Sequence, residues 1–414
     1  MKFNKAKLIM LISLAIFVFF FSSDFGLIDV EKTSIITAIA IDKENDEYLL
    51  TAQIAVPEAT DTNSENQKAE IAGSGKTVGE ALKNLGDVSG WFPKLAFCNL
   101  ILLGNGLAET NVVNVLDYFA KTLRIQDSAI IALSEKSAKE LLSLSTPLDN
   151  ISSFAMQKIM LKTPGFDRDV ISTDIKTFCA GHYSYAKSAV MPIVKIVSSD
   201  GSDSQKSQQN SSGGGQSGSS SSSSGGNQSQ GQQSQSNSQN KNNLFDARTT
   251  ALFLDGKMVG QLDPDLTVTF NAFNHPMKET TISVDKVPLN DKECNYLLTI
   301  LDSKSNIKID AQDSALSVTA ELSLYCKVSD VDSDYSEDAL SQNNPLPKPL
   351  IERTKQMLKE RIEELFETSR QTGCDFLKIK ERLYRYHNKQ YNRYKDNCLS
   401  DMNVSVNVEV YGQQ

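Results

Sequence analysis

Residues 198–243 read SSDGSDSQKSQQNSSGGGQSGSSSSSSGGNQSQGQQSQSNSQNKNN and contain no aromatic or aliphatic side chain. Because such a segment has no apolar surface to bury, nothing offsets the conformational entropy that ordering it would cost. We therefore expect a disordered Ser/Gly/Gln-rich linker that behaves as a flexible coil. It divides the folded part of the chain in two, either as a tether between folded units or as a surface insertion in one of them.

A short apolar leader precedes the first folded half. Lysines near the N-terminus are followed by an apolar run from Leu8 to Phe21, the order of an n-region and an h-region. No small-residue cleavage site and no lipobox cysteine follows, so we expect residues 1–23 to be an uncleaved signal anchor that holds the body outside the cytoplasm. A signal peptide cleaved at an unrecognised site is the alternative. The predicted membrane-anchor residues are Leu8, Leu11, Leu14, Phe17 and Phe21.

Residues 30–197 have the pattern of an N-terminal mixed α/β domain. Residues 35–41 are apolar on both faces, which is typical of a central strand, and residues 48–56 alternate as its partner. Residues 57–69 are polar and indicate a loop. Apolar spacing further along predicts helices over 77–85, 112–123 and 137–144, and strands over 95–103, 129–133 and 185–197.

Two further folded units are predicted after the linker. Residues 244–300 are expected to form a middle β-rich domain, which opens with a hairpin turn at Asp255-Gly256. Residues 301–414 are expected to form a C-terminal α+β domain. Its main element is an amphipathic helix over 350–371, and its alternating valines near the C-terminus predict a half-buried final strand.

The chain of 414 residues is long enough for two or three domains, and a hydrophobic content of 40% is enough for their cores. The predicted fold class is α+β. An N-terminal membrane segment is followed by two or three mixed α/β domains, with a long C-terminal helix packed on antiparallel strands.

Charge and residue counts argue against several functions. A net charge of −9 argues against a nucleic-acid partner. The six cysteines form no Cys-x-x-Cys and the three histidines lack metal-ligand spacing, so we expect no metal site and no cofactor. Residues 73–77 resemble a phosphate loop, but Glu70 occupies the place of its first glycine. We interpret His182, beside Tyr183 and Tyr185, as structural rather than catalytic.

An aromatic and basic run occupies residues 382–394. The simpler interpretation is a helix that packs one tyrosine face and exposes the other. The functional interpretation is a contact with a partner or near a membrane, because Tyr and Arg are favoured in the cores of interfaces. The candidate partner contacts are Tyr384, Tyr386, Tyr391, Arg393 and Tyr394.

Several stretches, taken in order, resemble the Ger(x)C family, the C subunits of bacterial spore germinant receptors. They are IITAIAID at 35–42, GKTVGEAL at 75–82, ALFLDGKMVGQL at 251–262 and CDFL at 374–377, together with the long helix and the final valine strand. The chain departs from the family in two ways. It lacks the lipobox cysteine followed by Trp-Asp, and its linker is longer.

The resemblance implies a non-enzymatic subunit on the outer face of the spore inner membrane. There it would work with a polytopic A subunit and a transporter-like B subunit in nutrient-triggered germination. The alternatives are an exported, membrane-anchored surface hydrolase and a ligand-binding module. A hydrolase requires a concave site of ionisable groups with shifted pKa values, and a module requires an apolar pocket. A subunit is expected to expose an apolar or aromatic patch.

Overall fold

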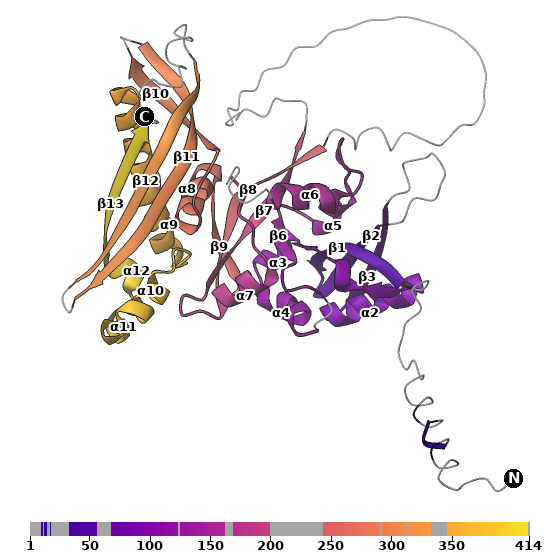
Figure 1. Ribbon diagram of the computed structural model, residues 1–414. Coiled ribbons are helices and arrows are strands. Elements are labelled where there is room, and N and C mark those ends of the chain that lie inside the picture. Colours follow the sequence, from indigo (N-terminus) through magenta and orange to yellow (C-terminus); the bar gives the residue numbers. More distant parts are fainter. Residues whose placement is uncertain are drawn as a thin grey trace, which may run out of the picture.

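Two β-sheets that lie side by side, each packed against helices, make up the protein (Figure 1). The computed structural model describes residues 10, 12–14, 17, 33–55, 68–122, 125–161, 169–198, 243–289, 292–312, 315–332 and 346–412. Within these residues the predicted mixture of helices and strands is confirmed.

The first sheet has nine strands. Its order is β3-β2-β1-β5-β6-β7-β8-β9, and the short β4 pairs with the beginning of β1. The central strands β1, β5, β6 and β7 are parallel, and antiparallel pairs extend the sheet at both edges. The strands are β1 (Thr33–Glu44), β2 (Glu47–Ala55), β3 (Lys68–Gly75), β4 (Phe92–Lys94), β5 (Leu100–Leu103), β6 (Ile130–Ser134), β7 (Ser188–Ser198), β8 (Asn243–Leu254) and β9 (Lys257–Leu262).

Helices cover both faces of this sheet, as a central strand that is apolar on both sides requires. Ile36, Ile39 and Ile41 of β1 face one core, with α2, α3, α4 and α7, whereas Ala38 and Ala40 face the other, with α5 and α6. The helices are α2 (Val78–Ser89), α3 (Asn105–Ala108), α4 (Val113–Thr122), α5 (Ala138–Ser143), α6 (Ser152–Met160) and α7 (Ile175–His182).

Strand β3 differs from the sequence-based expectation, which has a loop up to residue 69 and a loop before the helix at 77. Residues 68–75 instead pair antiparallel with β2 and form the edge of the sheet. The two glycines of β3 let α2 pack directly on this edge. A Cβ on Gly73 would lie 2.5 Å from the Ala81 carbonyl oxygen, and one on Gly75 would lie 2.6 Å from the Ala81 nitrogen.

The predicted linker connects two neighbouring strands. Ser198 at the end of β7 is paired with Asn243 at the start of β8, and residues 199–242 between them lie outside the described residues. Of the two interpretations, the pairing corresponds to an insertion within one sheet rather than a tether between two units.

The predicted middle domain, residues 244–300, is divided between the two sheets. Its hairpin forms β8 and β9 of the first sheet, and the turn at Asp255-Gly256 is confirmed, with positive φ at both residues. The remainder forms β10 and the beginning of β11, which belong to the second sheet. The boundary between the sheets therefore falls after β9.

The second sheet has four strands in the order β10-β11-β12-β13. The strands are β10 (Thr280–Leu289), β11 (Lys292–Ala311), β12 (Leu316–Val331) and β13 (Met402–Gly412). The pairs β10–β11 and β11–β12 are antiparallel, as expected for the strands that the long helix packs on, but β12 and β13 are parallel, which was not expected. A parallel return requires a crossover, and the helices between β12 and β13 supply it.

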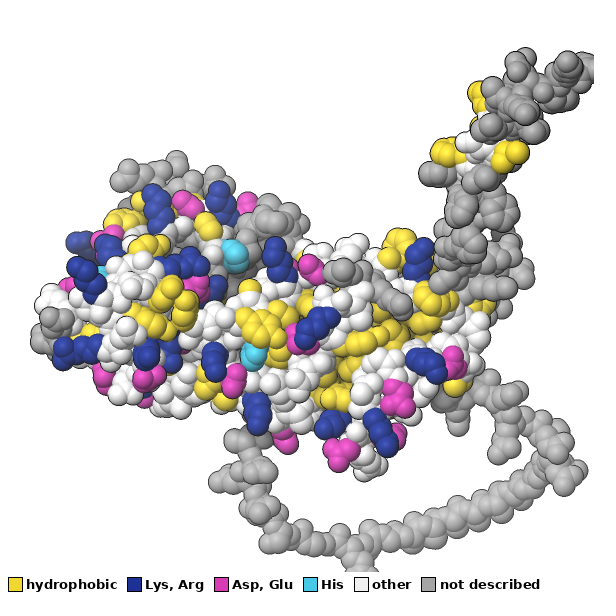
Figure 2. Space-filling view, turned by 90° about the horizontal axis from the view of Figure 1, so that it is seen from below, with side chains coloured by type: hydrophobic (Ala, Val, Ile, Leu, Met, Phe, Trp, Pro, Cys, Tyr) yellow, Lys and Arg dark blue, Asp and Glu magenta, His cyan; other side chains and the backbone are white. Residues whose placement is uncertain are grey.

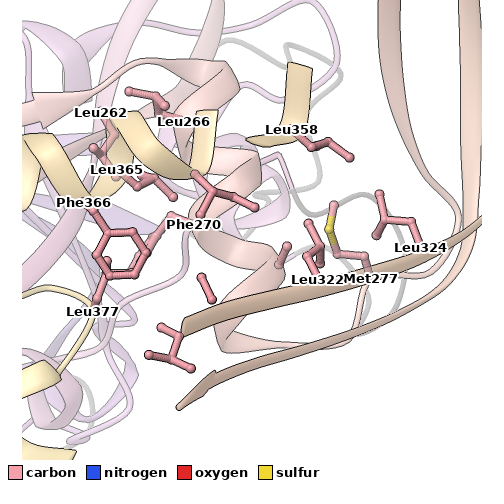
Figure 3. Packing of buried hydrophobic residues seen from close by; sticks show 14 of the residues in the cluster. Leu262, Leu266, Phe270, Met277, Leu322, Leu324, Leu358, Leu365, Phe366 and Leu377 are labelled. Atoms are coloured by element: carbon pink, nitrogen blue, oxygen red, sulfur yellow. The ribbon is translucent and has the colours of Figure 1, made fainter. Parts of the chain in front are cut away.

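One long helix dominates this crossover. The predicted helix at 350–371 corresponds to α9 (Lys348–Thr372), which ends at Gly373 in the left-handed conformation, as expected for a C-cap. The other helices of this half are α8 (Pro264–Asn274), α10 (Ile379–Tyr386), α11 (Asn388–Tyr394) and α12 (Cys398–Asp401). Figure 3 shows side chains of α8, α9 and β12 meeting in one core, with Phe270, Leu365 and Leu322 among them.

Strand β8 contributes side chains to the cores of both halves. Ala251 and Phe253 belong to the core of the first sheet, whereas Leu252 between them belongs to the core of the second half. Successive side chains of a strand point to opposite faces, so one strand can serve both. This shared strand joins the two halves through packed side chains as well as through the chain itself.

The predicted membrane anchor lies mostly outside the described residues. Leu8, Leu11 and Phe21 are not described, and Leu14 and Phe17 are exposed helical residues. Among the described residues, no helix combines the length and the apolar composition that crossing a membrane requires.

Candidate interaction surfaces

The segment Cys374 to Leu377, one of the stretches that carry the family resemblance, joins the two sheets. The Cys374 thiol donates a hydrogen bond to the carbonyl oxygen of Phe253 at 3.3 Å, and the Asp375 amide donates to the Ser188 hydroxyl at 2.9 Å. Both partners belong to the first sheet. The segment is buried, and it therefore acts as a clamp between the sheets.

Asp375 also caps the first turn of the next helix, α10. Its carboxylate oxygens accept hydrogen bonds from the amides of Ile379 and Lys380, each at 2.7 Å. Burial raises the pKa of the Asp375 carboxyl to about 7, and the two amide bonds oppose that rise. The carboxyl satisfies amides that a helix N-terminus leaves unpaired, so its role here is structural.

A cluster of three tyrosines lies at the same junction. Tyr185, which precedes β7, stacks on Tyr384 of α10 with ring centroids 3.9 Å apart. Tyr391 of α11 meets both rings edge-on, at 5.6 Å and 5.1 Å. Aromatic pairs at such distances are attractive beyond the area that they bury. The cluster therefore holds α10 and α11 against the first half of the chain.

This packing separates the predicted partner-contact residues into those that contact the chain itself and those that are exposed. Tyr384 and Tyr391 contact Tyr185 of the same chain, and Tyr394 is buried with its hydroxyl donating to the Gln312 carbonyl oxygen at 2.7 Å. For Tyr394 the expectation of a surface contact is wrong, because its ring belongs to the core. Tyr386, with 75% of its surface exposed, and the exposed Arg393 are the members for which a partner contact stays a prediction.

One groove lies between α9 and strands of the second sheet. It has a volume of about 1060 Å³ and is lined by charged side chains from both sides. Glu352, Arg353 and Lys359 come from α9, and Glu321 and Glu409 come from the strands. Pockets for small ligands are lined mainly by apolar and aromatic groups, whereas this lining contains no aromatic residue.

A second groove, of about 520 Å³, has a different lining. Leu82, Trp91, Phe92, Pro93 and Tyr118 surround it where α2, β4 and α4 meet. Trp91 and Phe92 are partly exposed. The helix and strand patterns of the sequence do not indicate this surface. One feature of the sequence could have indicated it. Trp91, Phe92 and Pro93 directly follow Gly90, where the helix ends and polar turn residues are usual.

The residues considered for catalysis occupy structural positions. The His182 ring packs edge-on against Tyr183 at 4.8 Å, and the Tyr183 hydroxyl donates to Asp117 at 3.0 Å. Burial, followed by the charge of Asp117, raises the pKa of the nearby Cys179 thiol, which disfavours the thiolate that a nucleophile requires. Tyr185 belongs instead to the tyrosine cluster at the junction.

The glycine-rich residues 73–77 also have a structural role. Thr77 caps α2 through a hydrogen bond from the Glu80 amide at 3.1 Å, and the Lys76 amide donates to the Glu80 carboxylate at 2.8 Å. This arrangement resembles a capping box rather than a phosphate cradle. In the part of the chain that the structure describes, no three His, Cys, Asp or Glu residues form a potential metal site.

Comparisons with known proteins match both halves of the chain. Residues 27–196 match a family model described as "Spore germination protein N-terminal domain", and residues 248–412 match one described as "Spore germination B3/ GerAC like, C-terminal". The fold is similar to a solved structure reported as "Crystal Structure of the GerBC protein", with a TM-score of 0.50 and 16% identity over 93% of this chain and 100% of that one. No curated protein matches significantly.

Proposed function

This chain belongs to the spore germination B3/GerAC-like family, and from that premise we propose that it is the non-enzymatic C subunit of a nutrient germinant receptor. The observation that carries the proposal is the match of the N-terminal and the C-terminal family model, in order, over residues 27–196 and 248–412. In this role the chain acts in spore germination at the inner membrane by binding an A and a B membrane subunit.

Two features of the molecule favour binding over catalysis. Burial raises the pKa of Cys98, Cys326, Cys374 and Cys398 to about 12, so these thiols stay protonated and unreactive near neutral pH. The apolar, aromatic surface around Trp91 is the kind of patch that a scaffold subunit is expected to expose.

Affinity purification from spore membranes tests the subunit role. A tagged full-length chain is expected to bring A- and B-type subunits with it after gentle solubilisation, whereas a tagged, unrelated spore membrane protein is not. Recovery of the chain without either subunit, from membranes that contain both, would contradict the proposal.

Substitution of Leu14 and Phe17 by Asp tests attachment through the leader. Each charge costs about 2.5–3.5 kcal/mol at the centre of a membrane helix, so the double variant is expected to leave the membrane fraction. Leu148→Asp, at a position that is 89% exposed in the folded body, is the matched control and is expected to stay bound. The fractionation includes the cytoplasm, because the variant can also fail to be exported.

Mass spectrometry of the mature N-terminus gives an independent measurement. A peptide that begins at or before Leu8 is expected for an uncleaved anchor. A mature chain that starts between residues 22 and 26 would refute the anchor and leave the protein attached through its partners alone.

A further inference from the structure

We propose that an apolar surface next to the first strand contacts the lipid–water interface of a bilayer. This surface, called the Trp91 surface below, consists of Val88, Trp91, Phe92 and Phe97. The inference deepens the proposed function and rests on its membrane attachment. The inference specifies the face of the folded body that is turned toward the lipid.

The composition of the Trp91 surface fits this role. Each of its four side chains is exposed, from 38% for Phe92 to 79% for Val88. Single exposed apolar residues are common on proteins, but a group of this size with three aromatic rings marks an interaction site. Trp is favoured at the depth of lipid headgroups, and Phe is common on apolar faces that lie in the membrane interface.

The position of the surface supports lipid as the occupant. Strand β4 pairs with the first residues of β1, where Thr33 lies opposite Phe92 and Ile35 opposite Lys94. Residues 22–32 separate the apolar leader from Thr33, and a chain of that length spans at most about 40 Å. An inserted leader therefore limits the distance between the bilayer and this end of the sheet to about 40 Å.

The backbone around Trp91 is held in place by the end of α2. Gly90 has the left-handed conformation, with φ of 70°, and its amide donates to the Gly86 carbonyl oxygen at 2.9 Å. The Trp91 amide donates to the Ser89 hydroxyl at 3.2 Å. The ring is thus presented from a fixed turn, which lowers the entropy that contact with a surface would cost.

Lysines next to the surface suit anionic lipid. Lys83 and Lys94 are both exposed, and the pairing of Lys83 with Asp87, at 3.4 Å, is between exposed side chains and therefore weak. Long lysine side chains extend their ammonium groups toward phosphates while apolar neighbours insert. Figure 2 shows hydrophobic side chains gathered over the first-sheet half of the face seen from below, with both basic and acidic side chains at its borders.

Two exposed apolar residues of the first half, Leu148 and Phe154, lie away from α2. Leu148 and Phe154 flank or belong to α6, which covers the other face from α2. They therefore provide control positions in the same folded half.

Trp91 is the single tryptophan of the chain, so its fluorescence reports on this surface without any substitution. The full-length protein is reconstituted into vesicles of phosphatidylcholine and phosphatidylglycerol, and flotation measures attachment independently. On floated protein we expect a blue-shifted emission, protection from iodide, and loss of intensity when the acyl chains carry bromine.

Variants connect the signal to the surface. Phe97→Asp and Val88→Asp are expected to float like the wild type, because the leader is intact, but to lose bromine quenching and regain iodide quenching. Leu148→Asp is expected to behave like the wild type in both measurements. Circular dichroism detects a folding defect in either surface variant. If one variant is misfolded, the other still tests the lipid contact.

The outcomes separate this inference from the proposed function. Protein that floats while Trp91 stays open to iodide and insensitive to bromine overturns the lipid contact but leaves membrane attachment intact. Protection of Trp91 that appears only after A- and B-type subunits are added also overturns it, in favour of a protein partner. Failure to float overturns the attachment, and the lipid contact with it.

Discussion

Single buried carboxylates hold helix N-termini in both halves of the molecule. Asp42 ends the stretch 35–42 that resembles the family, and Asp375 lies in the stretch 374–377. Asp42 accepts hydrogen bonds from the amides of Ala138 and Lys139 at 2.8 and 2.9 Å. Two of the residues that carry the resemblance, Asp42 and Asp375, are thus explained by packing and capping.

Asp42→Ala is expected to lower the free energy of unfolding by about 1–3 kcal/mol, since it leaves buried amides without an acceptor. Urea denaturation of the variant measures the change. Asp87→Ala removes an exposed carboxylate that is paired only with Lys83, and it is expected to change stability by less than about 1 kcal/mol. Equal effects of the two substitutions would contradict the capping role.

The raised pKa of the Asp375 carboxyl predicts that the stability of the protein depends on pH. Its folded pKa, raised to about 7, lies above the unfolded value of about 3.9, so the unfolded chain binds fewer protons between these values. Its contribution to stability is therefore complete below pH of about 4 and is lost as pH rises through about 7.

Asp375→Asn removes this titration. Denaturation at several pH values measures the unfolding free energy of both proteins. The value for the wild type minus that for the variant is expected to fall from acid to neutral pH. A difference that rises with pH would show that the two amide hydrogen bonds outweigh burial and that the carboxyl is ionised in the folded protein.

At the scale of elements, α10 and α11 are attached to the first half through the cluster of Tyr185, Tyr384 and Tyr391. Neither helix is long enough to be stable by itself in water, so each depends on this tertiary packing. The stacked pair and the two edge-on contacts supply part of it.

Tyr185→Ala is expected to lower stability by about 0.5–1.5 kcal/mol per lost aromatic pair and to speed amide hydrogen exchange in α10 and α11. Tyr386→Ala, at a ring that is 75% exposed, is the matched control and is expected to leave exchange unchanged. Unaltered exchange in the Tyr185 variant would mean that the cluster does not hold the helices.

At the scale of the whole molecule, the linker joins two strands that are already hydrogen-bonded neighbours. Its ends, Ser198 and Asn243, are paired opposite each other in the sheet. A shorter connection therefore has to span only the distance between two neighbouring strands. The entropy of closing a loop changes by only about 0.6 kcal/mol for each doubling of its length.

Deletion of residues 213–235 is therefore expected to leave the thermal midpoint unchanged or slightly raised. A chain with the same residues in scrambled order controls for composition. A midpoint that falls by more than several degrees in the deletion, but not in the scrambled chain, would show that the length of this segment supports the fold.

The sequence by itself determined the elements that depend on local chemistry. The cap at Thr77, the turn at Asp255-Gly256 and the stop at Gly373 are set by hydroxyl donors or acceptors and by glycine conformations within a few residues, and all three are present. The long helix α9 follows from an apolar stripe that continues over its whole length.

The tertiary structure alone decided which strands pair and which surfaces stay open. Strand β3 exists because β2 satisfies its backbone, and β13 is parallel because a helical crossover returns it to β12. Leu252 and Phe253 are adjacent in sequence but belong to different cores. Pairing and burial depend on residues far along the chain, so the patterns that predict helices and strands do not reveal an exposed surface such as the one around Trp91.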